Sequence, residues 1–342
     1  QMASAAVSQA NPYRYGEIVF SEVIGSVAKI GIGTGKGFAK FAPRARNIDS
    51  FRTEEYAREV AALRWARHRA LLRLEAVFVR GTFAYELYPL ADLGSCERII
   101  AAHYSAGLPE RAIGSIADAL LSALQYLHDR DIVHRNIRAK NILIDRNAGV
   151  RLAGMRHARM LPPETRRLCD YDNELENDLL WLAPEILAQD LNGYDSRADV
   201  YALGVTLVEL ANGFPPFTDM ERLEMLFEKL RGTTPRLLDS TTMPDREDPA
   251  RSCRTFSTTF HDMAELCLRA AVAARPSSAE VRSHSFVAKC SRKPVHVLLQ
   301  DARPFDTSVF GRDGEAKEDV PMPSATNSAV GMETAADDDW LF

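Results

Sequence analysis

The chain has 342 residues, of which 46% are hydrophobic and 26% charged, and its formal net charge is −5. This composition is typical of a globular protein and excludes a wholly disordered, collagenous or coiled-coil chain. No uncharged apolar run reaches the ~18 residues that span a bilayer, and no broad basic field is present. We therefore expect neither a membrane nor a nucleic acid as partner. Five cysteines without a CxxC pair argue against a disulfide framework and against a metal site.

Residues 15–90 are predicted to form short strands around a single helix. The helix is expected over residues 53–69, because its acids come early and its arginines late, which suits the helix dipole. Residues 1–14 are expected to form a flexible arm ahead of this region. The strand candidates are residues 17–24, 28–32, 38–41, 74–79 and 83–87.

From about residue 95 the pattern becomes helical. Apolar residues between Ile113 and Leu127 recur at i, i+3, i+4 and i+7, which predicts a long amphipathic helix. Two short strands are expected at residues 142–144 and 150–152, followed by a long loop over residues 155–182. Further helices are predicted over residues 198–212, 220–230, 260–269 and 277–284. A small strand-rich lobe followed by a larger helical lobe indicates an α+β protein.

After about residue 291 the apolar periodicity fades. Residues 311–342 hold eight acids and two bases, a charge of −6, so the rest of the chain is close to neutral. We expect residues 311–339 to be disordered. The chain nevertheless ends on Trp340, Leu341 and Phe342. Trp and Phe are large, rigid anchors, so an aromatic pair behind an acidic tail is typical of a docking peptide.

The run from His134 to Ile144 resembles the catalytic loop of protein kinases, H-R-D-L-x-x-x-N followed by an apolar strand. Three later segments also match kinase signatures in order and spacing. They are Ala183-Pro184-Glu185, Asp199-Val200-Tyr201-Ala202-Leu203-Gly204, and Arg275-Pro276, where the family's late arginine pairs with the A-P-E glutamate. The resemblance implies a bilobal protein-kinase fold over roughly residues 15–290. A small antiparallel-sheet N-lobe with helix C would occupy residues 15–90, a larger helical C-lobe residues 91–290, and a disordered acidic tail residues 291–342.

Two positions depart from what kinase chemistry needs. Asn136 stands where the catalytic-loop aspartate would accept the substrate proton, and an amide cannot take that proton. Gly154 stands where the D-F-G aspartate would hold magnesium. Asp131 and Asp145 are close in sequence, but neither lies at the expected spacing. We therefore expect a chain without catalytic residues, that is, a pseudokinase rather than an enzyme.

The positions of a nucleotide pocket are only partly kept. Of the glycine-rich loop only Gly25 remains. Lys40 lies one residue before the position of the family's third-strand lysine. Either a small deletion restores Lys40 to the pocket or the lysine is absent. Glu59 matches the helix-C glutamate and Asn141 the metal-binding asparagine. The resemblance implies that no cofactor is required, with ATP binding without magnesium left open.

Within the kinases the chain resembles one pseudokinase family, the sterile-twenty-related kinase adaptors, abbreviated STRAD. That family shows Gly-Leu-Arg where this chain has Gly154-Met155-Arg156 and ends on Trp-Glu-Phe, from which Leu341 departs by one residue. Further resembling segments are Trp181-Leu182-Ala183-Pro184-Glu185, Glu209-Leu210-Ala211-Asn212-Gly213, Leu237-Leu238-Asp239 and Arg254-Thr255-Phe256-Ser257.

The resemblance implies an adaptor that holds the serine/threonine kinase liver kinase B active by allostery. A helical-repeat scaffold, mouse protein 25, would capture Trp340, Leu341 and Phe342, giving a heterotrimer in the cytoplasm and the nucleus. Residues 155–182 are the candidate segment for contact with the partner kinase. Two alternatives remain open from the residues: an unconventional low-activity protein kinase, and a nucleotide-sensing binding module.

Overall fold

The computed structural model describes residues 18–24, 27–33, 38–47, 60, 66–74, 76–80, 83–89, 91–171, 178–243, 249–290 and 293–304. Contacts between Cα atoms divide the chain into two compact units. The first comprises residues 1–62, 74–90 and 305–342, and the second residues 63–73 and 91–304. None of the helices in the described ranges combines the length and apolar character that a bilayer crossing needs.

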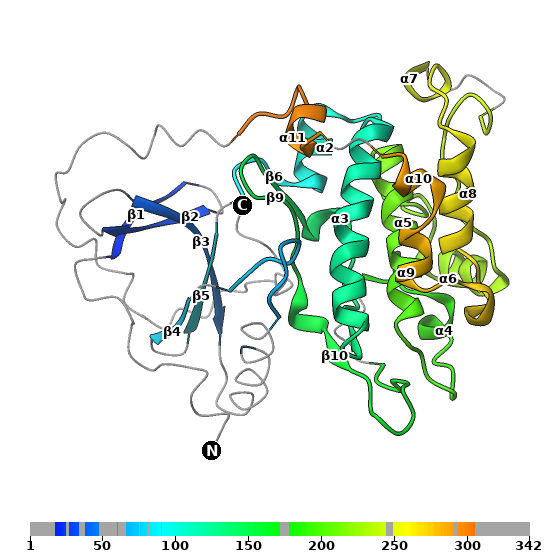
Figure 1. The fold of residues 1–342 in the computed structure, drawn as a ribbon, viewed down its shortest axis with the longest axis horizontal. Helices are drawn as coiled ribbons and strands as arrows, with labels where there is room; N and C mark the ends of the chain where they lie inside the picture. The colour runs from blue at the N-terminus through cyan, green and yellow to red at the C-terminus, as the bar shows by residue number, and fades with distance from the viewer. Residues whose placement is uncertain are drawn as a thin grey trace. The chain divides into compact units, whose positions relative to one another are not determined.

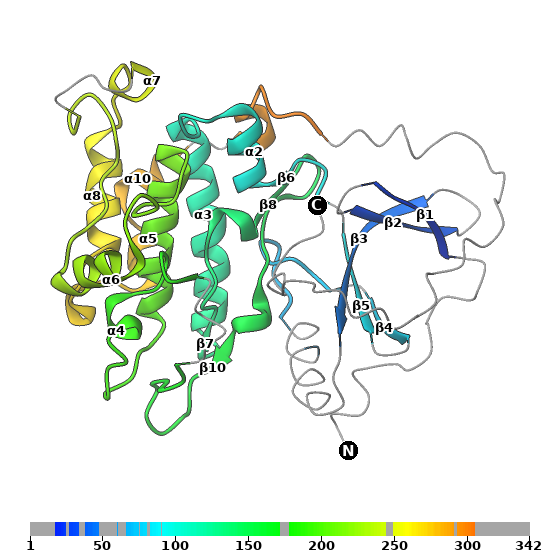
Figure 2. The same cartoon turned by 180° about the vertical axis from the view of Figure 1, so that it is seen from behind.

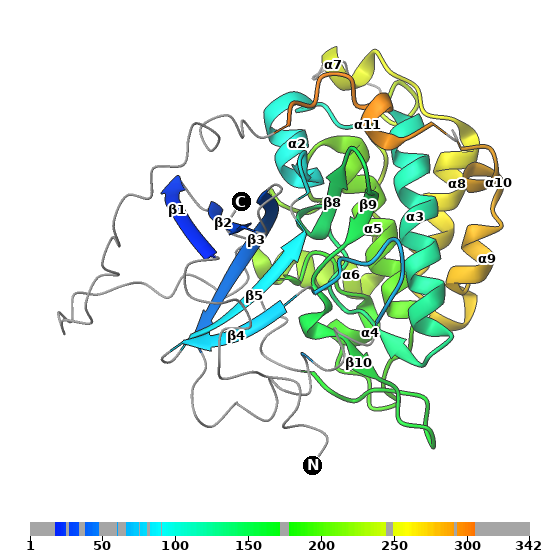
Figure 3. The same cartoon turned by 60° about the vertical axis from the view of Figure 1, so that its left-hand side comes forward.

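The first unit contains a five-stranded antiparallel sheet (Figure 3), in the order β1-β2-β3-β5-β4. Its strands are β1 (Ile18–Ile24), β2 (Val27–Gly33), β3 (Phe38–Asn47), β4 (Ala76–Arg80) and β5 (Phe83–Pro89). All five predicted strands are therefore confirmed. Proline has no N–H to donate, so it is tolerated where a strand has a partner on one side only. Pro43 meets this condition because β2 pairs with Phe38–Phe41 and only β5 lies beside β3 at position 43.

The predicted helix over residues 53–69 falls largely outside the described residues. Val60 is helical and fully buried. Residues 66–69 are not helical, and a turn covers Arg69 and Ala70. The helix boundary expected from the late arginines is therefore too far along the chain.

The second unit is built around α5 (Arg197–Asn212), in which every residue from Ala198 to Asn212 is buried. A helix that is buried all round lies in the core rather than on the surface. It packs against α3 (Glu110–His128), the predicted amphipathic helix, and against α8 (Thr258–Cys267). Figures 1 and 2 show α5 between these two helices from opposite sides. Gly213 ends α5 in the left-handed region, with φ 87°.

Short strands and helices complete the second unit. The hairpin of β8 (Ile142–Asp145) and β9 (Gly149–Leu152) pairs with β6 (Gly94–Ser95), and β7 (Ile132–Val133) pairs with β10 (Arg159–Met160). The other helices are α2 (Cys96–His103), α4 (Pro184–Leu187), α6 (Arg222–Arg231), α7 (Pro249–Ser252), α9 (Ser278–Arg282), α10 (Ser285–Ala288) and α11 (Val295–Leu298). Among the described residues, 3-10 turns lie at Ala139–Asn141, Met155–His157 and Val272–Ala274.

Two differences from the sequence-based expectation concern segments expected to be irregular. Residues 293–304 belong to the second unit, although the tail was expected to begin at residue 291. They carry α11, which packs on α3 and buries Val295 and Leu299. The loop expected over residues 155–182 contains the 3-10 turn Met155–His157 and strand β10.

A buried ion pair joins α4 to the loop before α9. Arg275 is 1% exposed, and its guanidinium donates to both carboxylate oxygens of Glu185, at 2.6 and 3.1 Å. Bidentate geometry makes such a pair strong. The pairing that the kinase resemblance implied for these two residues is confirmed.

Candidate functional site

The predicted catalytic-loop segment, residues 134–141, is held by the first turn of α5. The carboxylate of Asp199 accepts hydrogen bonds from the backbone N–H groups of His134 at 2.7 Å and Arg135 at 2.8 Å. His128 Nε2 donates a third bond at 2.9 Å. Burial opposes ionisation of Asp199, but the hydrogen bonds and charges of His128 and His134 together outweigh burial and lower the pKa of this carboxyl.

The same bonds impose an uncommon backbone conformation. Arg135 has φ 68°, a left-handed conformation that costs a non-glycine residue about 1–3 kcal/mol. Farther along α5, Thr206 Oγ1 donates to the carbonyl of Ile137 at 3.0 Å, and Glu209 accepts from the N–H of Ala139 at 3.1 Å. The loop conformation is therefore set by α5, more than 60 residues later in the chain.

Asn136, Asn141 and Gly154 lie together. Asn141 Nδ2 donates to the carbonyl oxygen of Asn136 at 3.0 Å and to its Oδ1 at 2.8 Å. Gly154 has φ 86°, and a Cβ placed there would lie 2.8 Å from Asn141 Nδ2. All three residues were singled out from the sequence. Here they form one amide cluster, in which the side-chain oxygen of Asn136 already accepts a hydrogen bond from Asn141.

The side chain of Arg138, in the same loop, forms a buried ion pair with the end of the 155–182 segment. Arg138 forms an ion pair with Asp178, and both side chains are buried. Trp181, three residues on, donates from Nε1 to Glu209 at 2.8 Å. Burial raises the pKa of Glu209 to about 7. The catalytic loop, the end of the 155–182 segment and α5 are thereby joined.

The space between these elements is small. A cavity lined by Asn136, Asp178, Trp181 and Asp199, among others, has a volume of about 10 Å³. This is about the room that one water molecule needs. The cavity therefore has space for about one water molecule.

Helix α6 fastens the same segment from another side. Lys229 is fully buried, and its Nζ donates to the carbonyl oxygens of Leu179 at 3.0 Å and Leu180 at 2.7 Å. Burial lowers the pKa of Lys229 to about 7. Sequence reasoning missed Lys229, Arg138 and Asp178. Position 138 lies within the kinase-like loop, but no sequence spacing links it to Asp178.

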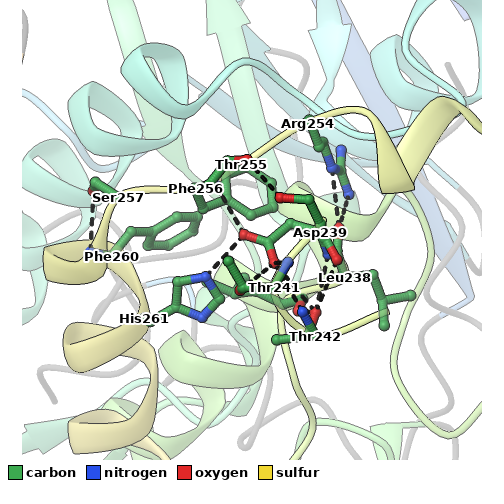
Figure 4. Close-up of polar contacts among 12 residues, drawn as sticks. Leu238, Asp239, Thr241, Thr242, Arg254, Thr255, Phe256, Ser257, Phe260 and His261 are labelled. Atoms are coloured by element: carbon green, nitrogen blue, oxygen red, sulfur yellow. Dashed lines mark hydrogen bonds and ion pairs between the residues drawn. The ribbon is translucent and has the colours of Figure 1, made fainter. Parts of the chain in front are cut away.

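Two of the segments that resemble the adaptor family, residues 237–239 and 254–257, meet in a polar cluster around Asp239 (Figure 4). The buried Asp239 carboxylate accepts from Thr241 N at 2.8 Å, Phe256 N at 2.8 Å and His261 Nε2 at 3.0 Å. Burial opposes ionisation, but these bonds outweigh it and hold the pKa of Asp239 well below its usual range. Arg254 donates to the carbonyl oxygen of Leu238 at 3.1 and 3.0 Å.

This cluster is anchored to the end of α5. Asn212 Oδ1 accepts from the N–H of Leu238 at 2.8 Å, and Asn212 Nδ2 donates to the carbonyl of Arg236 at 2.9 Å. The segments around residues 212, 237–239 and 254–257 thus hold one another in place. Their contacts indicate a structural role in fixing the long connection between α6 and α8.

The remaining predicted site residues are not placed. The backbone of Lys40 pairs with Gly31 in the sheet, while its side chain is not described. Gly25, Glu59, Trp340, Leu341 and Phe342 lie outside the described residues. The expected nucleotide pocket and docking peptide therefore stay predictions.

The amide cluster can be tested with a matched pair of glycines. Gly154 and Gly149 both have positive φ, but a Cβ at Gly149 would have no atom within 4 Å. We expect Gly149→Ala to lower the free energy of unfolding by about 1–2 kcal/mol through backbone strain alone. Gly154→Ala should lower it further, because Asn141 must move. Denaturant unfolding of both variants, and of each in an Asn141→Ala background, measures this excess. An excess that survives in that background would contradict the proposed contact.

Two buried groups make opposite pH contributions to stability. Burial lowers the pKa of His134 to about 4, so between pH 4 and 6.5 the unfolded chain binds the extra proton and stability rises with pH. The raised pKa of Glu209 means that the folded chain binds the extra proton, so its contribution falls as pH rises from 4.5 to 7. Glu209→Gln should therefore steepen the rise of stability between pH 5 and 6.5, by up to about 1.4 kcal/mol per pH unit. Denaturant midpoints at several pH values test this, and a slope equal to that of the wild type would refute it.

Comparison with known proteins places these motifs in a family. The protein kinase domain model matches residues 21–287. STE20-related kinase adapter protein alpha of Rattus norvegicus is 32% identical over 308 residues, covering 80% of this chain and 78% of the relative. The Homo sapiens protein of the same name is 32% identical over 308 residues, covering 80% and 71%. STE20-related kinase adapter protein strd-1 of Caenorhabditis elegans is 33% identical over 272 residues, covering 75% and 70%.

These matches confirm the kinase fold and the adaptor resemblance that were predicted from the motifs. The chain belongs to the protein kinase domain family and, within it, to the STE20-related kinase adapter proteins.

Proposed function

We propose that this chain is a catalytically inactive kinase adaptor that binds a partner serine/threonine kinase of the liver kinase B type and activates it allosterically. The observation that carries this proposal is the amide cluster of Asn136 and Asn141 over Gly154. An amide at position 136 cannot act as the base for a substrate hydroxyl. Gly154 offers no carboxylate to magnesium. Relatives of the chain are named kinase adapter proteins.

The proposed mechanism is binding to one conformation of the partner. An allosteric activator must bind the active state of its partner more tightly than the inactive state. A face that is ordered before binding supports this, because it has little conformational entropy left to lose. Asp178, Trp181 and Lys229 fasten the end of the 155–182 segment to the body of the second unit. We propose this segment as the face that meets the partner kinase.

The proposal includes a scaffold and a location. A helical-repeat scaffold of the mouse protein 25 type would bind Trp340, Leu341 and Phe342 and complete a heterotrimer in the cytoplasm and nucleus. No cofactor would be required, and any ATP would bind without magnesium. Asn141 and Glu59 motivate one alternative, an unconventional low-activity kinase, and a nucleotide-sensing module is the other; the assays below separate them from the adaptor.

The test is reconstitution of the three proteins from purified components. We expect the full chain to assemble with the scaffold and the partner kinase and to raise partner activity at least several-fold. A chain ending at Asp339 should lose scaffold binding, because it lacks both aromatic anchors. Affinity measured for each chain, with partner activity on a peptide substrate, gives the readout.

A parallel assay addresses catalysis by the adaptor itself. Phosphate transfer with magnesium or manganese should be the same for the wild type and a Lys40→Ala/Asn141→Ala variant. Turnover above that variant would contradict the inactive state and favour the unconventional kinase. Unchanged scaffold affinity after truncation would refute the docking peptide. Failure of the folded full chain to raise partner activity would refute activation. If activation fails and ATP raises the melting temperature of the chain, the nucleotide-sensing module is favoured.

A further inference from the structure

One acidic side chain in the activation segment (residues 155–182) lies between two arginines, one from the catalytic loop and one from an earlier part of the same segment. Asp170 Oδ2 accepts a hydrogen bond from a terminal guanidinium nitrogen of Arg135 at 3.2 Å and from Arg159 Nε at 3.2 Å. Arg135 belongs to the catalytic loop and Arg159 to β10. The Arg135 side chain has no exposed surface, whereas Arg159 and Asp170 are 29% and 34% exposed. We refer to these three residues as the Asp170 clamp.

The backbone around the clamp is paired with the stretch that precedes α5. Leu168 and Tyr194 exchange two backbone hydrogen bonds of 2.9 Å each. The hydroxyl of Tyr194 donates to the carbonyl oxygen of Asp170 at 2.9 Å, and the hydroxyl of Tyr171 donates to that of Asp190 at 2.5 Å. The carboxylate is thus presented to the arginines by a segment that is itself held at several points.

The direction of Arg135 follows from the anchoring of the catalytic loop. Asp199 holds the N–H of Arg135, and the residue takes φ 68°. The Arg135 side chain is consequently held in one buried position. A buried positive charge is costly unless an anion pairs with it. Asp170 supplies one negative charge to that position from 35 residues along the chain.

Kinase activation segments are commonly ordered when an added phosphate pairs with arginines. A phosphate and a carboxylate share the property that matters here, an anion with several acceptor sites for guanidinium N–H groups. Here the arginines already have a carboxylate partner that needs no modifying enzyme. We propose that Asp170 is a built-in anion that keeps the activation segment docked without phosphorylation.

The consequence for the partner kinase rests on the proposed function. If residues 155–182 form the face that meets the partner, the clamp keeps residues 159–171 of that face docked on the catalytic loop. The adaptor would then be competent for binding as soon as it has folded, and its control would lie in assembly rather than in modification of this segment.

Hydrogen exchange on the full chain tests the clamp itself. Asp170→Asn keeps the shape of the side chain and removes its charge. We expect amide exchange in residues 159–171, including the N–H of Leu168, to rise about tenfold. The N–H groups of His134 and Arg135, held by Asp199, should stay protected, which separates local release from global unfolding. Asp170→Glu should restore part of the protection.

Glu164→Gln is the matched control. It removes the same charge from the same segment, and no partner of Glu164 is recorded among the described residues. Its exchange should equal that of the wild type. Arg159→Gln combined with Asp170→Asn should add little to Asp170→Asn alone, because both break the same contact.

A phosphatase arm addresses the modification. Wild-type chain purified from eukaryotic cells should show the same exchange before and after phosphatase treatment. Faster exchange after treatment would overturn the proposal, and so would wild-type exchange in Asp170→Asn.

Partner activity is measured in parallel. Faster exchange in Asp170→Asn with full partner activation would support the clamp and contradict the proposed partner face, so the two failures are distinguishable.

Discussion

The carboxylate of Asp199, buried in the first turn of α5, is the contact on which the rest of the site depends. It accepts the N–H groups of His134 and Arg135 and so turns the catalytic loop into a left-handed step at Arg135. That step aims the Arg135 side chain toward Asp170, and it places Asn136 beside Asn141. One buried acid therefore orders both the catalytic loop and, through the Arg135–Asp170 ion pair, the activation segment.

The groups that hold this arrangement together include Asn141, which matches the metal-binding asparagine of the kinase motif. Asn141 gives its amide hydrogens to Asn136, and Arg138 gives its charge to Asp178. In each of these contacts both partners belong to the site itself. These contacts hold the loop in one conformation. The proposed absence of catalysis rests on the residue types at positions 136 and 154, and the proposed adaptor role on a segment that these contacts hold in place.

Sequence reasoning was most successful where the signal is local or belongs to a family motif. The strand-rich pattern of residues 15–90 located the five strands, the period-3.6 pattern located α3, and the spaced motifs singled out Asn136, Asn141 and Gly154. The misses are contacts between distant positions. Asp170 with Arg135, Asp178 with Arg138, and Lys229 with the carbonyls of Leu179 and Leu180 join residues 35 to 50 positions apart. Charges of either sign are frequent on protein surfaces, so the sequence does not reveal which of them the fold will bury as partners.

Hydrogen exchange in Asp199→Asn tests the central claim most directly, because this substitution keeps the volume of the side chain and removes its charge. The account predicts that the N–H groups of His134 and Arg135 lose protection together with residues 159–171, while the core of α3 and α8 keeps its own. Loss of protection in the catalytic loop alone, with the activation segment unchanged, would contradict the claim that Asp199 orders both.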